Sequence, residues 1–334
     1  MNTLGIDHGT RGIRFCALSS GGQEIVFEIG REDAAGVSII EEINRRVPFS
    51  IDLVGMSYSM GDAIDAVVDL HSVVGRGVLK GSTGSYVGGG TKVFDEIYNS
   101  DLKAVLIPGL HRGIGCLDQR FKALFSHFAA AEKVGLSYHI FREANKSGKV
   151  DNLVISDISS NTVTIGIKDG CFFGAVDACL GAAGVLHGPL DLDAIRSVDD
   201  GEVSANEAFY SAGVMKILEG GSGDIFDSEN DSAQLALDSL ILGVSMEIFG
   251  FLGVLDSEVV AITGSAGFDD RVFNPLKDVL EKFVTVKRFN GFSAARGCAE
   301  IACAVLDGEK EILGIPVLFS ITGRFKDHGS FTGT

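Results

Sequence analysis

The spacing of apolar residues along the chain predicts short strands alternating with helices. Runs of β-branched residues bounded by turn residues predict strands at the start and in the middle of the chain. Near the start, strands are expected over 3–8, 12–19 and 23–30. In the middle, they are expected over 152–156, 161–168 and 171–177. The two halves of the chain therefore open in the same way.

The remaining pattern fills both halves with helices and further strands. Helices are predicted over 36–46, 91–99, 118–133, from Ser204, 231–255, 269–283 and 293–306. Strands are predicted over 52–57, 104–107, 136–141, 258–267 (where the strand runs into a turn of small residues) and 284–289. The helix over 231–255 carries charge only at Asp238 and Glu247. We expect it to be a buried helix between two domains.

The two opening segments also share a motif. Residues 4–19 read LGIDHGTRGIRFCALS, and residues 153–167 read LVISDISSNTVTIGI. In each segment a strand ends in an aspartate, small or hydroxyl-bearing residues follow, and a second strand begins. Internal duplication concerns the whole fold rather than one turn. We therefore expect two similar α/β domains, each with a mixed five-stranded sheet.

Asp7 and Asp157 occupy equivalent positions of this repeat. A carboxylate at the entry of a tight turn, next to free backbone N–H groups, suits a metal-bound phosphate chain, although two ordinary hairpins are the alternative. Both aspartates are expected to hold Mg²⁺, because two carboxylates at one site repel each other without a cation. On this argument, Asp157→Asn should leave the unliganded protein no less stable.

Residues beside the two aspartates are expected to contact phosphate oxygens. They are Gly9, Thr10 and Arg11 in the first turn and Ser159 and Ser160 in the second. Arg14 is expected to pair with an acidic neighbour. Thr162 is either a further phosphate contact or a strand-forming residue. Asp177 is a candidate general base or water-orienting residue, and His8 and His187 are weaker candidates for proton transfer.

Composition and charge narrow the choice of protein class. A chain of 334 residues with 46% hydrophobic residues and a mean hydropathy of +0.27 has room for two packed domains. The net charge of −17 disfavours nucleic acid and anionic membranes as partners. No stretch of about 18 residues is free of charges and turn breakers, so no membrane span is expected. The N-terminus has no basic region, so no signal peptide is expected either.

Cysteine and glycine usage add two further expectations. The six cysteines are scattered, which indicates a reducing, cytoplasmic protein, although Cys116 and Cys171 leave a ligated cluster as a minor alternative. The 44 glycines indicate tight turns and close backbone approaches. Residues 75–90 are especially rich in glycine and are either a mobile loop over a ligand or a surface insertion. We predict that they are the most mobile part of the first domain.

Four segments resemble landmarks of the acetate kinase, sugar kinase, Hsp70 and actin superfamily, in the same order. LGIDHGTRGIRF resembles its first phosphate loop, and NLVISDISSNTVTI resembles its second. VVAITGSAG resembles its adenosine motif, and GFSAARGCAEIACAVL resembles the connecting helix at its inter-domain hinge. The resemblance implies a two-domain actin-like ATPase fold, related to ribonuclease H. In that fold, duplicated mixed sheets are flanked by helices and a nucleotide cleft lies between the domains.

The resemblance also implies ligands and domain limits. ATP and Mg²⁺ are the implied cofactors, and Gly264, Ser265, Ala266 and Gly267 are the implied adenosine-side contacts. The first domain is expected over 1–147 and the second over 148–334, with the boundary in the polar segment 145–151. The helix from 293 is expected to return toward the first domain.

A narrower resemblance concerns residues 80–113, 116–141 and 176–196. These segments are similar to the methanogenesis marker 12 family, an archaeal group distantly similar to predicted butyrate kinases. The leading interpretation is a Mg²⁺-dependent ATPase linked to methanogen metabolism or enzyme maturation.

Three other functions stay open. The first is a kinase that phosphorylates a short carboxylic acid or a sugar, and the second is a non-catalytic nucleotide- or protein-binding module. The third is an iron–sulfur ATPase, which depends on the cysteines. Besides the nucleotide, a small carboxylic acid or a client protein is the expected partner, and a homodimer is left open.

Overall fold

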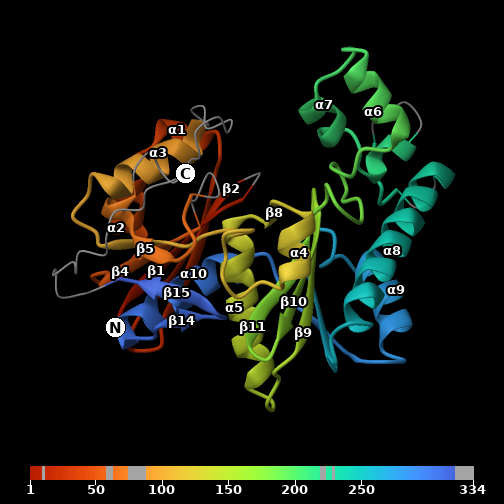
Figure 1. The fold of residues 1–334 in the computed structure, drawn as a ribbon. Helices are drawn as coiled ribbons and strands as arrows, with labels where there is room; N and C mark the ends of the chain where they lie inside the picture. The colour runs from red at the N-terminus through yellow and green to blue at the C-terminus, as the bar shows by residue number, and fades with distance from the viewer. Residues whose placement is uncertain (10–11, 58–62, 74–87, 219–222, 228–229, 320–334) are drawn as a thin grey trace.

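The computed structural model describes residues 1–9, 12–57, 63–73, 88–218, 223–227 and 230–319. These residues form two lobes, each built on a mixed β-sheet (Figure 1). The segment 145–151, where a domain boundary was predicted, lies between the last helix before the second sheet and that sheet's first strand.

The first sheet has eight strands in the order β14-β15-β5-β6-β4-β1-β2-β3. Their bounds are β1 Thr3–His8, β2 Gly12–Leu18, β3 Glu24–Gly30, β4 Leu53–Met56, β5 Val67–Asp69, β6 Ala104–Leu106, β14 Glu311–Ile312 and β15 Ile315–Leu318. The expected five strands are β3, β2, β1, β4 and β6. The prediction of only five strands here was wrong because β5 and the β14–β15 pair add to the sheet beyond β6.

The second sheet has the predicted five strands, in the order β11-β10-β9-β12-β13. Their bounds are β9 Leu153–Ile158, β10 Thr162–Lys168, β11 Cys171–Val176, β12 Val259–Thr263 and β13 Thr285–Arg288. β10 is antiparallel to β9 and β11, and β12 is parallel to β9 and β13. The strands β3-β2-β1-β4-β6 have the same order and directions. The duplication predicted from the two motifs is therefore confirmed.

Helices cover the sheets and connect them. Their bounds are α1 Asp33–Gly36, α2 Ile39–Arg46, α3 Gly88–Tyr98, α4 Gln119–Leu124, α5 Ala131–Asn145, α6 Leu192–Asp199, α7 Ala205–Tyr210, α8 Asp231–Leu252, α9 Asp270–Leu280 and α10 Ser293–Asp307. A small two-stranded sheet pairs β7 Leu110–His111 with β8 His127–Ala129. The helix predicted from Ser204 is α7, which begins with a capping box formed by Ser204 and Glu207.

The chain between 118 and 145 differs from its prediction. The Asp118 side chain caps a short helix, α4, that ends at Leu124. The chain then extends into β8, and α5 begins only at Ala131. The predicted helix over 118–133 and the predicted strand over 136–141 were therefore both wrong. Short apolar runs fit strand and helix equally well, and packing on α10 decided for a helix.

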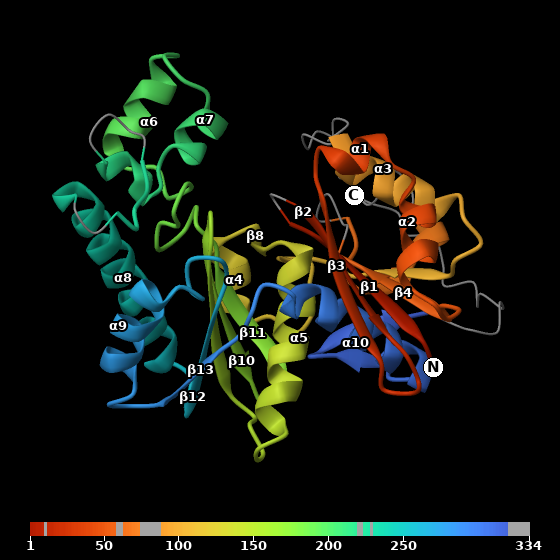
Figure 2. The ribbon, with the colours of Figure 1, turned by 180° about the vertical axis from the view of Figure 1, so that it is seen from behind.

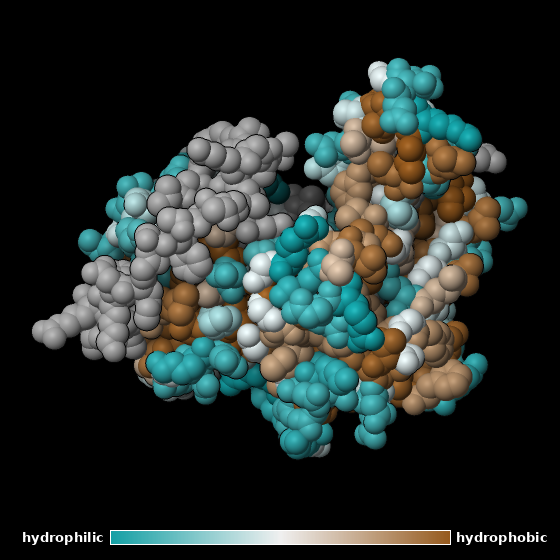
Figure 3. All heavy atoms as spheres, in the orientation of Figure 1, coloured by the Kyte–Doolittle hydropathy of each residue, from teal (hydrophilic) through white to brown (hydrophobic). Residues whose placement is uncertain are grey.

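The prediction that α8 lies between two domains was also wrong. Its buried side packs on β9 and β10 of the second sheet, and it lies at the outer side of that lobe (Figure 2). Its opposite side exposes apolar residues, among them Leu235, Leu242 and Met246. Apolar side chains gather on the surface of this lobe (Figure 3). Within the described part of the chain, α8 alone is long and apolar enough to span a membrane by length and composition. Ala236, Leu240, Val244 and Ile248 are nevertheless buried against the sheet, as in a core helix.

Alternation along the strands divides the interior into separate cores. In β9, Leu153 and Ile155 face a central core with α5 and α10, whereas Val154 and Ile158 face the core under α8 and α9. In β1, Leu4 and Ile6 face the core under α1, α2 and α3. The odd-numbered residues of β1 and β9 therefore point to the space between the lobes.

The helix α10 lies between the lobes and contacts β1, β4 and α5. Glycines make this approach close enough for backbone contact. A Cβ at Gly5 would overlap the carbonyl of Ala295, and a Cβ at Gly297 would overlap the carbonyl of Gly135. The helix from 293 thus returns to the first domain, as predicted.

We expect Gly297→Ala to destabilise the fold. The added methyl group would overlap the backbone of α5 at Gly135, which cannot rotate away as a side chain could. The free energy of unfolding should therefore fall by at least about 2 kcal/mol. Gly250→Ala in α8 is the matched control, because no atom lies within 4 Å of its Cβ position. That change should stabilise the helix by about 0.5–1 kcal/mol. Urea unfolding measures both, and equal effects at the two glycines would contradict the packing argument.

Candidate functional site

A cavity of about 160 Å³ lies where the turns after β1, β9 and β12 meet the N-terminal ends of α5 and α10. Its lining comes from both lobes and is mostly charged, hydroxyl-bearing, amide or glycine residues. The lining residues are Asp7, Gly9, Arg14, Glu132, Lys133, Leu136, Asp157, Ser159, Ser160, Asn161, Thr263, Gly264, Ser265, Asn290, Gly291 and Ala294. The two repeated motifs therefore lie at one site.

Strand geometry explains why Asp7 and Asp157 both reach this cavity. Each is the odd-numbered residue near the end of the first strand of its sheet, and odd positions of both strands face the space between the lobes. Each aspartate is also the last residue but one of its strand and lies opposite the following strand, Asp7 opposite Arg14 and Asp157 opposite Val163, with the first turn longer than the second by one residue. The duplication thus creates a pair of facing carboxylates.

Asp7 is almost completely buried, with 1% of its surface exposed. Its Oδ2 lies 3.4 Å from Nη1 of Arg14, which also contacts Glu28. Its Oδ1 has no hydrogen-bond partner among the described residues. Burial, reinforced by Glu132, raises the pKa of Asp7 to about 7, although Arg14 and Lys133 oppose this change. The expected pairing of Arg14 with an acidic neighbour is confirmed.

Asp157 has partners for both carboxylate oxygens. Oδ2 accepts a hydrogen bond of 3.1 Å from Nζ of Lys133, and Oδ1 accepts one of 2.8 Å from the Ser159 hydroxyl. Lys133 also lies 3.3 Å from Glu132. Burial alone would lower the pKa of Lys133, but these two carboxylates raise it overall, so the ammonium stays charged.

Two protein cations thus balance the charges at this site. The sequence argument assumed that Asp7 and Asp157 needed a cation from solution to offset their repulsion. In the structure Arg14 forms an ion pair with Asp7, and Lys133 forms one with Asp157. Oδ1 of Asp7, which has no partner among the residues that the structure describes, is the atom that suits a Mg²⁺ ion, because Mg²⁺ prefers a carboxylate oxygen and keeps several waters.

The turn after β12 divides into two parts. Gly264 and Ser265 line the cavity, and Gly264 has φ of +92°, a conformation that favours glycine. The N–H of Ser265 donates to the hydroxyl of Ser159. Ala266 and Gly267 do not line the cavity, and both donate their N–H groups to the carbonyl of Ile158. These two residues hold the turn against the end of β9.

Asp177 does not line the cavity either. It follows β11 and lies 3.8 Å from His127, and burial raises its pKa. His187 contacts the side chain of Asn161, and burial lowers its pKa. Thr162 is fully buried and donates to the carbonyl of Ala183, so it supports the strand. The N–H of His8 donates to the Ser57 hydroxyl at 3.4 Å.

Some predicted features lie outside the described residues or lack support as metal sites. Thr10, Arg11 and most of the glycine-rich segment 75–90 are not described. Cys116 and Cys171 both lie near Gly314, but they belong to no group of three or more metal-binding side chains in the described part of the chain. Burial raises the pKa of Cys116 to about 11, which disfavours the thiolate that a metal requires.

Sequence reasoning missed Glu132, Lys133, Asn161 and Asn290 as site residues. The error in the 118–145 segment hid the first two, because a helix over 118–133 would place them at its C-terminal end. In the structure they occupy the first turn of α5, directed toward the cavity. The three alanines before Glu132 gave no capping signal that could have marked this start.

The arrangement of two duplicated mixed sheets around a polar cavity is the two-domain fold of acetate and ROK sugar kinases. The chain is similar to acetate kinase from Porphyromonas gingivalis, with a TM-score of 0.60, 12% identity and coverage of 91% of this chain and 99% of that one. A propionate kinase from Francisella tularensis gives a TM-score of 0.58 at 11% identity, covering 89% and 98%. At these identities the likeness concerns the fold alone.

The chain belongs to the UPF0285 family of methanogen proteins. It is 46% identical over 336 residues to the UPF0285 protein of Methanocaldococcus jannaschii, covering 96% of this chain and all of that one. It is 40% identical over 331 residues to the UPF0285 protein of Methanothermobacter thermautotrophicus, covering 94% and 98%. No family model matches the chain.

The raised pKa of Asp7 predicts a pH dependence of stability. The pKa of about 7 in the folded state exceeds the ordinary value of 3.8, so the folded protein holds this proton up to neutral pH. This contribution to stability is complete below pH 4 and is lost as the pH rises through 7. Asp7→Asn has no carboxyl group to titrate here. When the pH is raised from 5 to 8, wild type should therefore lose up to a few kcal/mol of stability relative to the variant. Urea unfolding measures this, and the same difference in free energy of unfolding between the two proteins at pH 5 and at pH 8 would contradict the prediction.

Lys133 changes the expectation for Asp157. Lys133→Met leaves a buried carboxylate without its cation and should lower the free energy of unfolding by about 3–5 kcal/mol. Asp157→Asn should now also destabilise the unliganded protein, contrary to the sequence argument. Adding Asp157→Asn to Lys133→Met should recover part of the loss, because the unpaired charge is removed. A double-mutant cycle in urea measures this, and single effects that add within about 0.5 kcal/mol would show no coupling.

Proposed function

We propose that the cavity between the lobes binds Mg²⁺–ATP and that the protein cleaves the bond to the γ-phosphate. The observation that carries the proposal is the meeting of both repeated turns, the turn after β12 and Glu132 at one cavity. Phosphoryl transfer depends on positioning and on neutralising charge, and this lining offers both kinds of group. A Mg²⁺–ATPase acting in methanogen metabolism or enzyme maturation is the function that we favour.

Each residue then has a role in the proposal. Asp7 would hold the Mg²⁺, which neutralises phosphate charge when bound. Ser159 and Ser160 would contact phosphate oxygens from the second lobe, with Gly9 opposite them. Asp157 would keep Lys133 in place beside these phosphates. The undescribed Thr10 and Arg11 remain candidate phosphate contacts, and Ala266 and Gly267 would act only by holding the adenosine-side turn.

Glu132 favours a particular acceptor. It is a carboxylate of the cavity that belongs to neither repeated turn, and Lys133 holds it from one side. A water molecule or a sugar hydroxyl must lose a proton when it attacks phosphorus, and a nearby carboxylate accepts that proton. A carboxylic acid is already deprotonated at neutral pH and would meet the negative charge of Glu132. Water or a hydroxyl acceptor is therefore our choice over a short carboxylic acid, and transfer to a hydroxyl is the second candidate function.

The test combines ATP turnover with variants. We expect the purified protein to release phosphate from Mg²⁺–ATP, or to transfer it to a member of a panel of sugars and short acids. Glu132→Gln should lower kcat by about 10²-fold or more with little change in nucleotide affinity. Asp193→Asn, an exposed carboxylate on α6, is the control and should leave turnover unchanged.

Three outcomes would contradict parts of this proposal. No turnover, no heat in calorimetry and no rise in melting temperature with Mg²⁺–ATP would indicate a non-catalytic module instead. Transfer to a short acid at full rate in Glu132→Gln would support the acid kinase and remove the role of Glu132 as a base. Nucleotide binding unchanged in Asp7→Asn at all Mg²⁺ concentrations would remove Asp7 as a metal ligand.

A further inference from the structure

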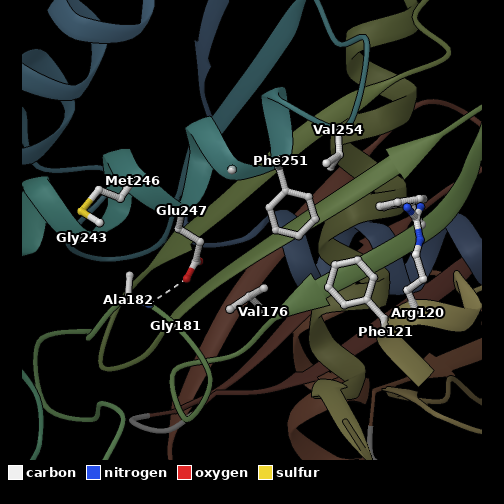
Figure 4. A pocket seen from close by; sticks show the side chains of 12 residues that line it. Arg120, Phe121, Val176, Gly181, Ala182, Gly243, Met246, Glu247, Phe251 and Val254 are labelled. Atoms are coloured by element: carbon white, nitrogen blue, oxygen red, sulfur yellow. Dashed lines mark hydrogen bonds between the residues drawn. The ribbon is translucent and has the colours of Figure 1, made fainter. Parts of the chain in front are cut away.

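A second and larger cavity lies on the opposite face of the second sheet. Its volume is about 640 Å³, and it is a pocket open to solvent that is lined by α4, β11, the 181–182 segment and α8 (Figure 4). Phe121, Phe173 and Phe251 form much of its apolar wall, and Phe121 stacks on Phe251 with ring centroids 6.1 Å apart. This second cavity lies on the side of β9 and β10 that faces α8. The cavity between the lobes, for which we propose nucleotide binding and which we call the nucleotide cavity, lies on the other side.

Glycines keep this cavity open. Gly243 and Gly250 present no side chain where α8 passes the cavity. At Gly250 no atom lies within 4 Å of the Cβ position, so the space beside it would accept a side chain. A glycine inside a helix costs stability relative to alanine. The size of the cavity is in the range that binds a small organic molecule.

One carboxyl group reaches into this apolar space. Oε2 of Glu247 accepts a hydrogen bond of 2.7 Å from the N–H of Ala182 (Figure 4). Oε1 is buried and makes no well-formed hydrogen bond to a described residue. Burial raises the pKa of Glu247 to about 7, Asp177 adds to this, and Thr164 and Ala182 oppose it. The carboxylate therefore has hydrogen-bond donors, but no cation of the described residues pairs with it.

The other charged residue of the cavity does not fill that need. Arg120 is on α4, and its guanidinium group makes two hydrogen bonds to Asp118, at 2.8 and 2.9 Å. Most of the Arg120 side chain is exposed to solvent. Among the described lining residues, Glu247 is thus the only charged side chain without an oppositely charged partner.

We propose that this cavity binds a small apolar molecule that carries a protonated amine, with the ammonium group beside the carboxylate of Glu247 and the apolar body against the three phenylalanine rings. A cationic donor is favoured because hydrogen bonds that involve an ionised donor or acceptor are roughly twice as strong as those between neutral groups. A carboxylate ligand would be repelled by the same group. This binding does not depend on the function proposed for the nucleotide cavity.

The position of Ala182 connects the two cavities. From Ala182 the chain continues to Val185 and Leu186, whose N–H groups donate to the carbonyls of Ser159 and Ser160. A ligand that holds Glu247 would therefore act on the segment that supports the second phosphate turn. This coupling, unlike the binding itself, assumes the proposed nucleotide function, so an occupied cavity should change the affinity for Mg²⁺–ATP.

The test uses 1-naphthylmethylamine as the probe and 1-naphthoate as its anionic counterpart, with binding followed by calorimetry on the full chain. The amine should bind at least about tenfold more tightly than the acid. Gly250→Leu should fill the cavity and abolish binding while the protein stays folded, because the helix gains a better helix former. Glu247→Gln should weaken the amine at least about tenfold and leave the acid no weaker. Gly36→Ala, in α1 of the other lobe, is the control and should bind like wild type.

Several results would overturn this proposal. Equal affinity for amine and acid would remove the role of Glu247, and amine binding unchanged in Gly250→Leu would place the probe elsewhere. Sedimentation showing that wild type self-associates, that Gly250→Leu does not, and that neither binds the amine would assign the surface to a second copy of the chain. An amine that binds as predicted in protein with no response to Mg²⁺–ATP would reject the nucleotide function alone.

Discussion

The close packing of α10 between the two lobes is the constraint on which the rest of the structure depends. Its backbone touches β1 at Gly5 and α5 at Gly135, so no side chain separates these elements. This contact sets the distance between the two sheets, and with it the width of the space into which Asp7 and Asp157 point. A single methyl group at these glycines would move charged groups as well as helices, because interiors are close-packed.

Within this fixed space each carboxylate has a cation from its own neighbourhood. Arg14, on the strand next to Asp7, balances the first lobe, and Lys133 balances Asp157 in the second. The charges across the cavity are therefore nearly compensated before any ligand enters, and the unpartnered Oδ1 of Asp7 is the exception. A buried charge that is left with a free oxygen is costly, and a ligand or ion that satisfies it recovers that cost.

The sequence by itself determined the parts of the fold that local patterns encode. The six opening strands and the duplicated Asp-containing turns follow from alternation and turn residues. The return of the helix from 293 was expected from the resemblance of that segment to a connecting helix. The period of two along β1 and β9 even fixes the shared face of Asp7 and Asp157, once both strands are placed in equivalent sheets. Length and charge excluded only broad classes of partner.

Tertiary structure alone decided the rest, because those features depend on contacts between distant segments. Packing on α10 made residues 131–145 a helix, and this brought Glu132 and Lys133 to the cavity instead of to a helix end far from it. The pairing of β15 with β5 extended the first sheet with residues 250 positions away, since Val317 pairs with Val67. The hydrophobic pattern also could not show whether α8 lies between the lobes or outside them. A sequence records how apolar a helix is, but not which surface covers it.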